Sequence, residues 1–392
     1  MVLAVKNKSK KSAVKQYIKY ALQKTLLPLC YNIDRRKPVD SKLVLFADSN
    51  SSVPPESMTA LMDELKKRGY VCEPHCCDFS KAGFAQMIKF MCRFMNRYAQ
   101  ARAVVVCNYF VPLHACNKRP ETCAVQLWHS CGAFKKFGYS SENDISKHFH
   151  GSVAKNIDLV TVSSPLCESV FAEAFRLSDG VAKATGVCRT DKLTDKAYTD
   201  LCRSKLYKAH PELEGKKLLL YLPTFRGDAG KAYSVGHEEI YKLDKALGDE
   251  WFTAVRMHPR IKNGRCDLCD MTTNELLPCA DMLITDYSSA VFEFSLFDKP
   301  MLLWCPDLEE YTAQRDFYLD LRRDMPCPVV TDAEKLGQAV RNEYEGFKSG
   351  AYSDFKEKYM SSCDGKATSR VADFIESVSY THLRAHETGA YL

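Results

Sequence analysis

The sequence lacks the features that would assign it to a membrane or a secretory route. No stretch of its 392 residues approaches the roughly 20 consecutive apolar residues that a membrane-spanning helix needs. No apolar segment with a cleavage-type ending follows the basic N-terminus, so a secretion signal is not expected. We therefore expect a chain that neither spans a membrane nor enters a secretory pathway.

The patterns of common metal sites are also missing. The 18 cysteines have no repeating spacing, and Cys266 and Cys269 form one C-x-x-C pair without a second pair at zinc-finger distance. No Asp-x-Asp pair occurs, so a pyrophosphate clamped by a metal ion is not the expected design. We predict no metal site, no cofactor, and buried thiols in a reducing compartment.

Length and charge are more informative. A chain of 392 residues is too long for one ordinary core and suits two domains. The net charge of +6 is modest but unevenly placed, because the segment 6–37 carries ten basic residues and only Asp34 as an acid. This asymmetry indicates a surface that binds anions.

The N-terminal segment has helical periodicity. Apolar residues recur at helical spacing from Val14 to Leu22, with Lys15 and Lys19 off that face, and Pro28 is expected to end the helix near Leu27. Such a helix can lie in the headgroup zone of an anionic membrane. The alternative, that its apolar stripe packs on the protein itself, is equally open.

Apolar runs and helical segments then alternate along the chain, which is typical of parallel sheets with crossover helices. The expected strands are 42–46, 103–107, 123–128, 159–162, 218–222, 252–255, 282–284, 301–304 and 329–330, and the expected helices include 56–68, 84–98, 166–175 and 290–297. The polar segment 191–215 is interpreted as a crossing between two halves. The predicted domains are a basic amphipathic segment 1–38, a Rossmann-like acceptor domain 39–205, a Rossmann-like donor domain 206–377, and a tail 378–392.

The tail departs from the rest of the chain. From Val378 the sequence VSYTHLRAHET has no apolar period and resembles the in-frame translation of a sequencing-library adapter. We expect native sequence to end near Ser377, and we assign no function to His382 or His386.

Four predicted strands end in groups that suit phosphate. His129 follows the strand 123–128, Arg226 ends PTFR, Arg256 and His258 end VRMHP, and a Ser-Ser pair, Ser288 and Ser289, follows Asp286. Histidine can accept a proton near neutral pH, arginine can hold a phosphate with two hydrogen bonds, and hydroxyls at a helix start can bind anions. Each group alone is more often structural, for example a helix cap. Their recurrence at strand ends, where an open sheet places its ligand, favours a binding site.

The motifs resemble a known family. LWHSCGAFKKFG is similar to the WHG-x-x-x-K motif of the CDP-glycerol:poly(glycerophosphate) glycerophosphotransferase family of teichoic-acid synthesis. The segments GVCRTDKL, YLPTFRGD, VRMHP and LITDYSSAVFEFSLFDKPMLLWCPDLEEY resemble further family motifs in the same order, over residues 40 to 375. Two departures are Ser130-Cys131-Gly132 in place of a glycine directly after the histidine, and a first turn, 48–52, without glycine.

The resemblance implies a GT-B fold, in which two Rossmann-like domains face a central cleft. It also implies that His129 and His258 are catalytic, with His129 as the candidate base. Donor phosphates would be held by Arg226, Arg256, His258, Thr285, Asp286, Ser288 and Ser289. The alternative for Asp286 is that it orients the loop or a donor hydroxyl. The further candidates are Gly186, Arg189, Asp191, Thr224, Lys135, Lys136, Asp307 and Tyr311.

The implied reaction is transfer of glycerol phosphate from CDP-glycerol to a lipid-linked polyol-phosphate or glycan acceptor, with release of CMP. The enzyme would work in the cytoplasm, against the anionic inner face of the membrane, and would not bind nucleic acid. Within enzymes, a ribitol-phosphate transferase or a GT-B nucleotide-sugar glycosyltransferase remains open. Outside enzymes, the basic N-terminus leaves a polymer- or nucleic-acid-binding protein as an alternative.

Overall fold

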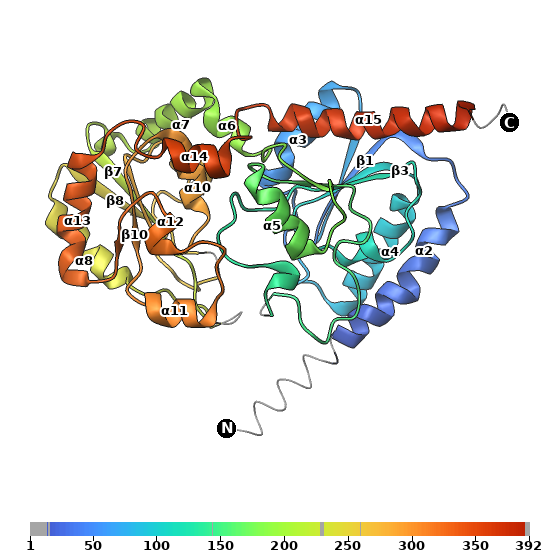
Figure 1. Ribbon diagram of the computed structural model, residues 1–392, viewed down its shortest axis with the longest axis horizontal. Coiled ribbons are helices and arrows are strands. Elements are labelled where there is room, and N and C mark those ends of the chain that lie inside the picture. The colour runs from blue at the N-terminus through green and yellow to red at the C-terminus, as the bar shows by residue number, and fades with distance from the viewer. Residues whose placement is uncertain (1–13, 15, 143, 228–230, 259, 389–392) are drawn as a thin grey trace. The chain divides into compact units, whose positions relative to one another are not determined.

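The computed structural model describes residues 14, 16–142, 144–227, 231–258 and 260–388. The chain divides into two compact units, each built on a parallel sheet (Figure 1). The first unit contains residues 1–129, 137–189 and 366–392, and the second contains 130–136 and 190–365. The basic residues before Val14, Lys15, Pro259 and the last four residues of the predicted tail lie outside the described residues.

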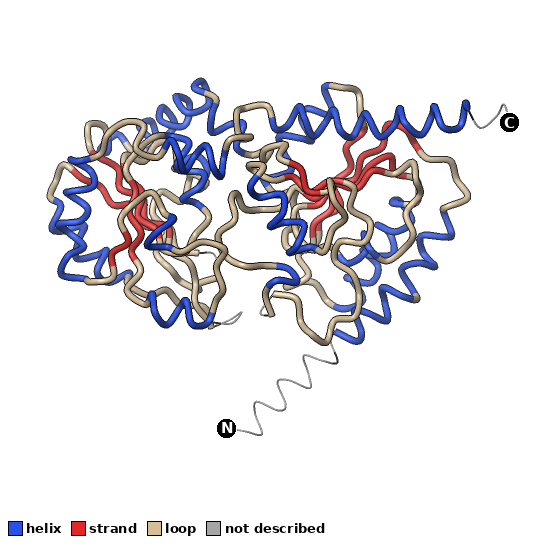
Figure 2. Tube along the Cα trace, in the orientation of Figure 1, coloured by secondary structure: helices blue, strands red, loops and turns tan. Residues whose placement is uncertain are grey.

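The first unit has a six-stranded sheet in the order β2-β1-β3-β4-β5-β6, with every pair parallel. Leu43 and Leu45 of β1 pack with α2 and α4, whereas Val44 and Phe46 face α3 and α15, so helices cover both faces of the sheet (Figure 2). The strands are β1 Asp40–Asp48, β2 Val71–Cys76, β3 Ala101–Val106, β4 Cys123–Gln126, β5 Leu159–Thr161 and β6 Ala182–Lys183. The main helices are α2 Leu26–Asp34, α3 Glu56–Lys67, α4 Phe84–Tyr98, α5 Leu166–Phe175 and α15 Ala367–Thr388.

The second unit has a five-stranded parallel sheet in the order β11-β10-β9-β7-β8. Its strands are β7 Lys217–Leu222, β8 Trp251–Val255, β9 Met282–Thr285, β10 Met301–Trp304 and β11 Val329–Val330. Its helices are α6 Thr190–Thr194, α7 Lys196–Ala209, α8 His237–Leu247, α9 Thr273–Leu276, α10 Ala290–Phe294, α11 Leu308–Gln314, α12 Leu321–Asp324, α13 Ala333–Gly346 and α14 Ser353–Met360. In both sheets the strand order reverses beside the first strand of the unit. Open parallel sheets bind ligands at the carboxyl ends of the strands that flank such a point.

The predicted parallel α/β architecture is confirmed, but the sequence analysis did not predict two of the strands. The strand β2 lies at a sheet edge and contains Pro74, which breaks the apolar pattern and is tolerated only at an edge. The strand β6 has only two residues.

The boundary between the units differs from the predicted one. The expected division at residues 205 and 206 lies inside α7, and the supposed polar crossing is largely helical. An ion pair of 2.8 Å between Lys205 and Glu275 ties α7 to the second unit. The chain then returns to the first unit, where Arg68, directly after α3, forms ion pairs with Asp373 and Glu376 of α15.

The N-terminal segment is helical at residues 16–24 and continues into α2 after a turn at Thr25. The predicted end near Leu27 is wrong, because Pro28 lies in the first turn of α2, where its missing N–H is not needed. Gln23 and Leu27 face the protein, while Val14, Tyr17 and Ile18 are 57%, 54% and 43% exposed. The described residues include no helix that is both long and apolar enough to cross a membrane.

Candidate functional site

His129 lies beyond the carboxyl end of β4 in the first unit. Its Nδ1 is 3.2 Å from the carbonyl oxygen of Cys107, at the end of the adjacent strand β3. A carbonyl can only accept, so Nδ1 carries the proton and Nε2 keeps a free lone pair. The side chain reaches solvent, but the protein atoms around it remove much of its water, and this desolvation lowers the pKa of His129 below its usual value. The ring is therefore neutral near pH 7 and able to accept a proton.

Trp128 sets the orientation of His129. Its φ of 57° lies in the left-handed region, which is unusual for a bulky residue. The indole packs against the imidazole at 4.2 Å between centroids, and against Phe137 and Phe175 at 5.3 and 5.1 Å. This aromatic packing holds the strained backbone from which His129 projects.

The charged neighbours of His129 come from several elements of the first unit. The charge of Arg189 lowers the pKa of His129, and the charges of Asp144 and Asp48 raise it. Arg189 is buried and donates to Ser57 Oγ at 3.4 Å. The sequence did not reveal Asp144, because it lies in an irregular loop, whereas Asp48 was visible at the end of the first strand but was interpreted only as part of a turn.

Two other predicted site residues, Gly186 and Asp191, lie in different units. Gly186 has a φ of +81° and donates its N–H to the carbonyl of Val162, which places it with Arg189 in the first unit. Asp191 lies in α6 and belongs to the second unit.

In the second unit, Asp286 organises the ends of β7 and β9. Its carboxylate is 1% exposed and accepts hydrogen bonds from Thr224 N at 2.8 Å, Thr224 Oγ1 at 2.6 Å and Arg226 Nη1 at 3.0 Å. Because these partners fill its oxygens, Asp286 fixes the loop after β7 rather than facing a phosphate. This geometry agrees with the alternative expectation that Asp286 orients the loop, and direct binding of a phosphate by Asp286 stays a prediction.

Arg226 is held between two carboxylates and two rings. Its Nε and Nη2 bind both oxygens of Asp307, at 2.8 and 3.0 Å, and Nη1 also donates to the carbonyl of Thr224. The guanidinium lies over Tyr287 and Tyr311, which stack at 3.9 Å with an interplanar angle of 4°. Burial raises the pKa of Asp307, but the hydrogen bonds from Arg226 outweigh it and the net pKa is lowered. Arg226 is predicted to bind a phosphate, but its Nε, Nη1 and Nη2 already donate hydrogen bonds within the protein.

Two more predicted phosphate ligands are engaged internally. Thr285 is fully buried and donates from Oγ1 to the carbonyl of Leu222 at 2.6 Å. Arg256 donates from Nη1 to the carbonyls of Asp267 and Leu268, at 3.2 and 3.0 Å. Both side chains shape the strand ends.

Ser288 and Ser289 remain half-buried just before α10. Ser288 Oγ accepts the N–H of Ala290 at 3.3 Å, whereas Ser289 makes no side-chain cap bond to the helix. The capping interpretation thus holds for Ser288 and not for Ser289.

His258 follows β8 and has the opposite tautomer to His129. Its Nδ1 accepts the backbone N–H of Arg260 at 3.1 Å, so in the neutral ring the proton is on Nε2. Burial lowers the pKa of His258, and the charges of Arg260 and Lys135 lower it further. The ring can therefore donate one hydrogen bond from Nε2 while remaining neutral.

The loop 130–136, directly after His129, belongs to the second unit. Lys136 N donates to Asp316 O, and Tyr318 N donates to Phe134 O, both at 2.9 Å. Gly132 has a φ of +65°, and a Cβ there would lie 2.4 Å from the ring of Phe292, so glycine is needed two residues later than the family motif has it.

This loop brings Lys135 into the second unit. Its Nζ donates to Tyr311 Oη at 3.4 Å, and burial lowers the pKa of the ammonium to about 8. The second unit thus offers the ammonium of Lys135, the neutral Nε2–H of His258 and the two serines before α10. Groups of these kinds suit an anionic substrate. Among the described residues, no group of three or more His, Cys, Asp or Glu side chains is placed to hold a metal ion.

Comparisons with known proteins agree with one another. The sequence profile of the family described as CDP-glycerol:poly(glycerophosphate) glycerophosphotransferase matches residues 29–377. The teichoic acid ribitol-phosphate primase of Bacillus spizizenii is 36% identical over 301 residues, covering 71% of this chain and 76% of that protein. The teichoic acid glycerol-phosphate primase of Bacillus subtilis is 31% identical over 297 residues, covering 71% and 74%.

Longer relatives and solved structures extend this comparison. The teichoic acid poly(ribitol-phosphate) polymerase of Bacillus spizizenii is 28% identical over 90% of this chain, which spans only 59% of that protein. The structure of the wall teichoic acid polymerase TagF has a TM-score of 0.71 at 19% identity, covering 94% of this chain and 99% of the other. A putative UDP-N-acetylglucosamine 2-epimerase from Listeria monocytogenes has a TM-score of 0.54 at 14% identity, covering 86% and 96%. The structures show a shared fold.

Proposed function

The chain belongs to the CDP-glycerol:poly(glycerophosphate) glycerophosphotransferase family, and we propose that it transfers a polyol phosphate from a CDP-polyol to a hydroxyl of a lipid-linked, teichoic-acid-like acceptor. CDP-glycerol is the donor that the family description names. CMP is the second product. The central cleft expected from the GT-B resemblance stays a prediction.

The observation that carries this proposal is the pair of opposite histidine tautomers. His129 presents a bare Nε2, which can take the proton of an attacking hydroxyl. His258 presents Nε2–H, which can stabilise negative charge on a phosphate oxygen. Transfer to a hydroxyl needs a base that accepts the proton and a donor that stabilises charge on the phosphate.

The proposed steps follow from these groups. His129 Nε2 removes the proton while the acceptor oxygen forms a bond to the phosphorus that carries the polyol. The bond from that phosphorus to the bridging oxygen breaks, and CMP leaves with the electron pair. The negative charge on the pyrophosphate and on CMP would be stabilised by His258, Lys135 and Ser289.

Arg226 and Asp286 receive a positioning role in this scheme. Their mutual ion pair and the bonds to Thr224 and Asp307 fix the loops after β7, β9 and β10. We assign Arg256 and Thr285 to the same supporting role.

CDP-ribitol is the second candidate donor, because the ribitol-phosphate primase is 36% identical and the glycerol-phosphate primase 31%. The purified chain should be incubated with a lipid-linked acceptor and, separately, with CDP-glycerol, CDP-ribitol and a nucleotide sugar. Mass spectrometry should show an acceptor enlarged by one polyol phosphate, together with CMP. An acceptor that gains only a sugar would make the chain a glycosyltransferase and would contradict the proposal.

We also propose that the N-terminal helix rests on an anionic membrane. The alternative was that its apolar stripe packs on the protein, and Leu22 of the stripe does pack against the core of the first unit. However, Tyr17 and Ile18 of the stripe are 54% and 43% exposed, and Leu29 and Ile33 of α2 are 63% and 69% exposed. Lys24 and the basic residues of segment 35–37 lie on the same helical stretch or directly after it and are also exposed. Apolar area and cations on one exposed helix suit a headgroup layer in which a lipid-linked acceptor would be found.

A further inference from the structure

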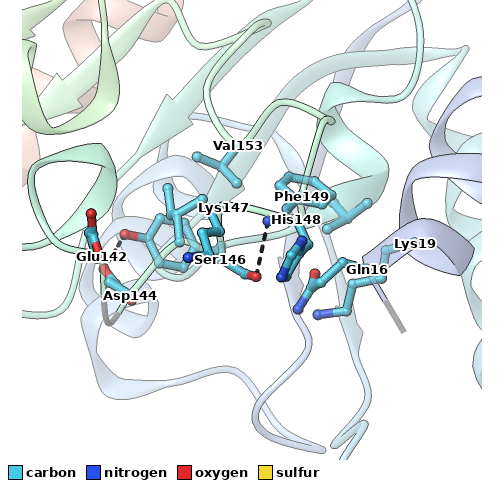
Figure 3. Close-up of a pocket in the computed structure, with 12 residues that line it drawn as sticks. Gln16, Lys19, Glu142, Asp144, Ser146, Lys147, His148, Phe149 and Val153 are labelled. Carbon is cyan, nitrogen blue, oxygen red and sulfur yellow. Dashed lines mark hydrogen bonds between the residues drawn. The ribbon is translucent and has the colours of Figure 1, made fainter. Parts of the chain in front are cut away.

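A cavity of about 480 Å³ lies in the first unit, between the N-terminal helix and the loop that contains Glu142 and residues 144–153 (Figure 3). Its two walls are tied together by Gln23, whose side-chain amide donates to Ser152 O at 2.8 Å and accepts from Ser152 N at 3.0 Å. This pair of bonds fixes the helix against the loop. The size falls in the range that protein sites for small ligands occupy.

The lining of the cavity is partly apolar, and its charged groups are arranged asymmetrically. Figure 3 places Glu142 and Asp144 at one end, and Gln16 and Lys19 of the N-terminal helix at the other, with Lys147 and Ser146 between them. Carboxylates accept hydrogen bonds from hydroxyl groups, and lysines bind phosphate. A ligand with hydroxyls at one end and a phosphate at the other matches this order of charges.

The carboxylate end is linked to the candidate base. Asp144 accepts a hydrogen bond of 2.6 Å from the hydroxyl of Tyr109, which also lines the cavity. The ring of Tyr109 packs on Trp128 at 5.2 Å, and Trp128 packs on His129. Tyr109 and Trp128 therefore connect the carboxylate end of the cavity to His129. The opposite end, with Lys19, lies at the helix proposed to face the membrane.

We propose that this cavity binds the terminal polyol-phosphate or sugar-phosphate unit of the acceptor. Lys19 and Lys147 bind its phosphate, and Glu142 and Asp144 bind its hydroxyls. The inference rests on the proposed function for the identity of the ligand, but the cavity can be tested without any transfer reaction.

The kinetic test uses Lys147→Gln and Glu142→Gln, whose side chains are exposed and carry no core packing. With a soluble oligo(glycerol phosphate) as acceptor, each should raise the acceptor KM about tenfold and leave the KM of the CDP-polyol unchanged. The matched controls are Lys89→Gln and Asp179→Asn, exposed positions of the same unit outside the cavity. An unchanged acceptor KM in both cavity variants would overturn the proposal.

The second test measures hydrogen exchange of the segment 141–153 in the full chain. Glycerol 3-phosphate or ribitol 5-phosphate should slow exchange there, and the double variant Lys147→Gln/Glu142→Gln should lose this protection. Equal protection by inorganic phosphate alone, or no protection by any of these probes, would contradict a polyol-phosphate site. If the wild-type chain shows protection but transfers no polyol phosphate, the cavity assignment stands and the proposed reaction fails.

Discussion

The carbonyl of Cys107 accepts a hydrogen bond from His129 Nδ1 at 3.2 Å and so fixes which nitrogen of the imidazole is free. The bond joins the ends of two adjacent parallel strands, β3 and β4. Nε2 is left as the only basic atom of the ring, and the lowered pKa keeps it unprotonated near pH 7. The pH dependence of the reaction should report this arrangement.

We predict that kcat/KM falls on the acid side with a midpoint below pH 6.5, the usual value for histidine. The direction follows because desolvation lowers the pKa of His129, so the ring stays neutral to a lower pH than a free imidazole. Arg189→Gln removes a cation that lowers this pKa, and the midpoint should then move to higher pH. A pH–rate profile of both proteins checks this, and a shift to lower pH in the variant would contradict the assignment of His129 as the base.

Arg226→Ala should act first on stability. The substitution leaves the buried carboxylate of Asp286 and the half-buried carboxylate of Asp307 without their cation, which costs about 3 to 5 kcal/mol in the free energy of unfolding. Urea unfolding measures this loss, and Arg323→Ala, in an ion pair whose arginine is 76% exposed, serves as the control with little expected change. If Arg226→Ala keeps full stability and loses only donor affinity, then Arg226 binds the donor directly, as the sequence motif suggested.

His114 should make the protein sensitive to acid. It is 3% exposed, burial lowers its pKa to about 3, and among the described residues neither ring nitrogen has a hydrogen-bond partner. The unfolded chain takes up a proton at about pH 6.5 and the folded chain does not, so stability falls as the pH drops below 6.5. At pH 5 the loss is about 2 kcal/mol.

His114→Leu should remove this contribution. The difference in the free energy of unfolding between pH 7 and pH 5 should shrink by about 2 kcal/mol in denaturant titrations of the variant. An unchanged difference would show that His114 does not control the acid response.

The N-terminal helix should bind anionic vesicles through its exposed stripe. Deleting residues 1–27 would also remove the buried Gln23 and Leu27, so the substitutions Ile18→Gln and Leu29→Gln are the sharper test. Together they should reduce sedimentation with phosphatidylglycerol vesicles and slow transfer to a lipid-borne acceptor. The rate of transfer to a short soluble acceptor should not change. Leu201→Gln, at a leucine that is 64% exposed in the second unit, is the control. Equal sedimentation of all three proteins would contradict the membrane assignment.

The sequence predicted more of the fold than of the site. Strands such as β7 and β9 are continuous apolar runs that both faces of a parallel sheet require, so their positions were visible. The edge strand β2 was not, because Pro74 interrupts its pattern. The motifs identified Arg226, Asp286 and Asp307, but only the folded chain shows that they bind one another, since residues 81 positions apart meet there. The place of Gly132 could not be predicted either, because the ring of Phe292 that demands it is distant in sequence.

The most direct test is CMP release by His129→Ala beside the wild-type protein, with CDP-glycerol or CDP-ribitol and a lipid-linked acceptor. Wild-type protein should release CMP in step with acceptor elongation. The variant should keep its fold and its affinity for the CDP-polyol while losing about 10² to 10⁴ in rate, because a general base has been removed. Unchanged turnover in the folded variant would contradict the central claim that His129 accepts the proton of the attacking hydroxyl.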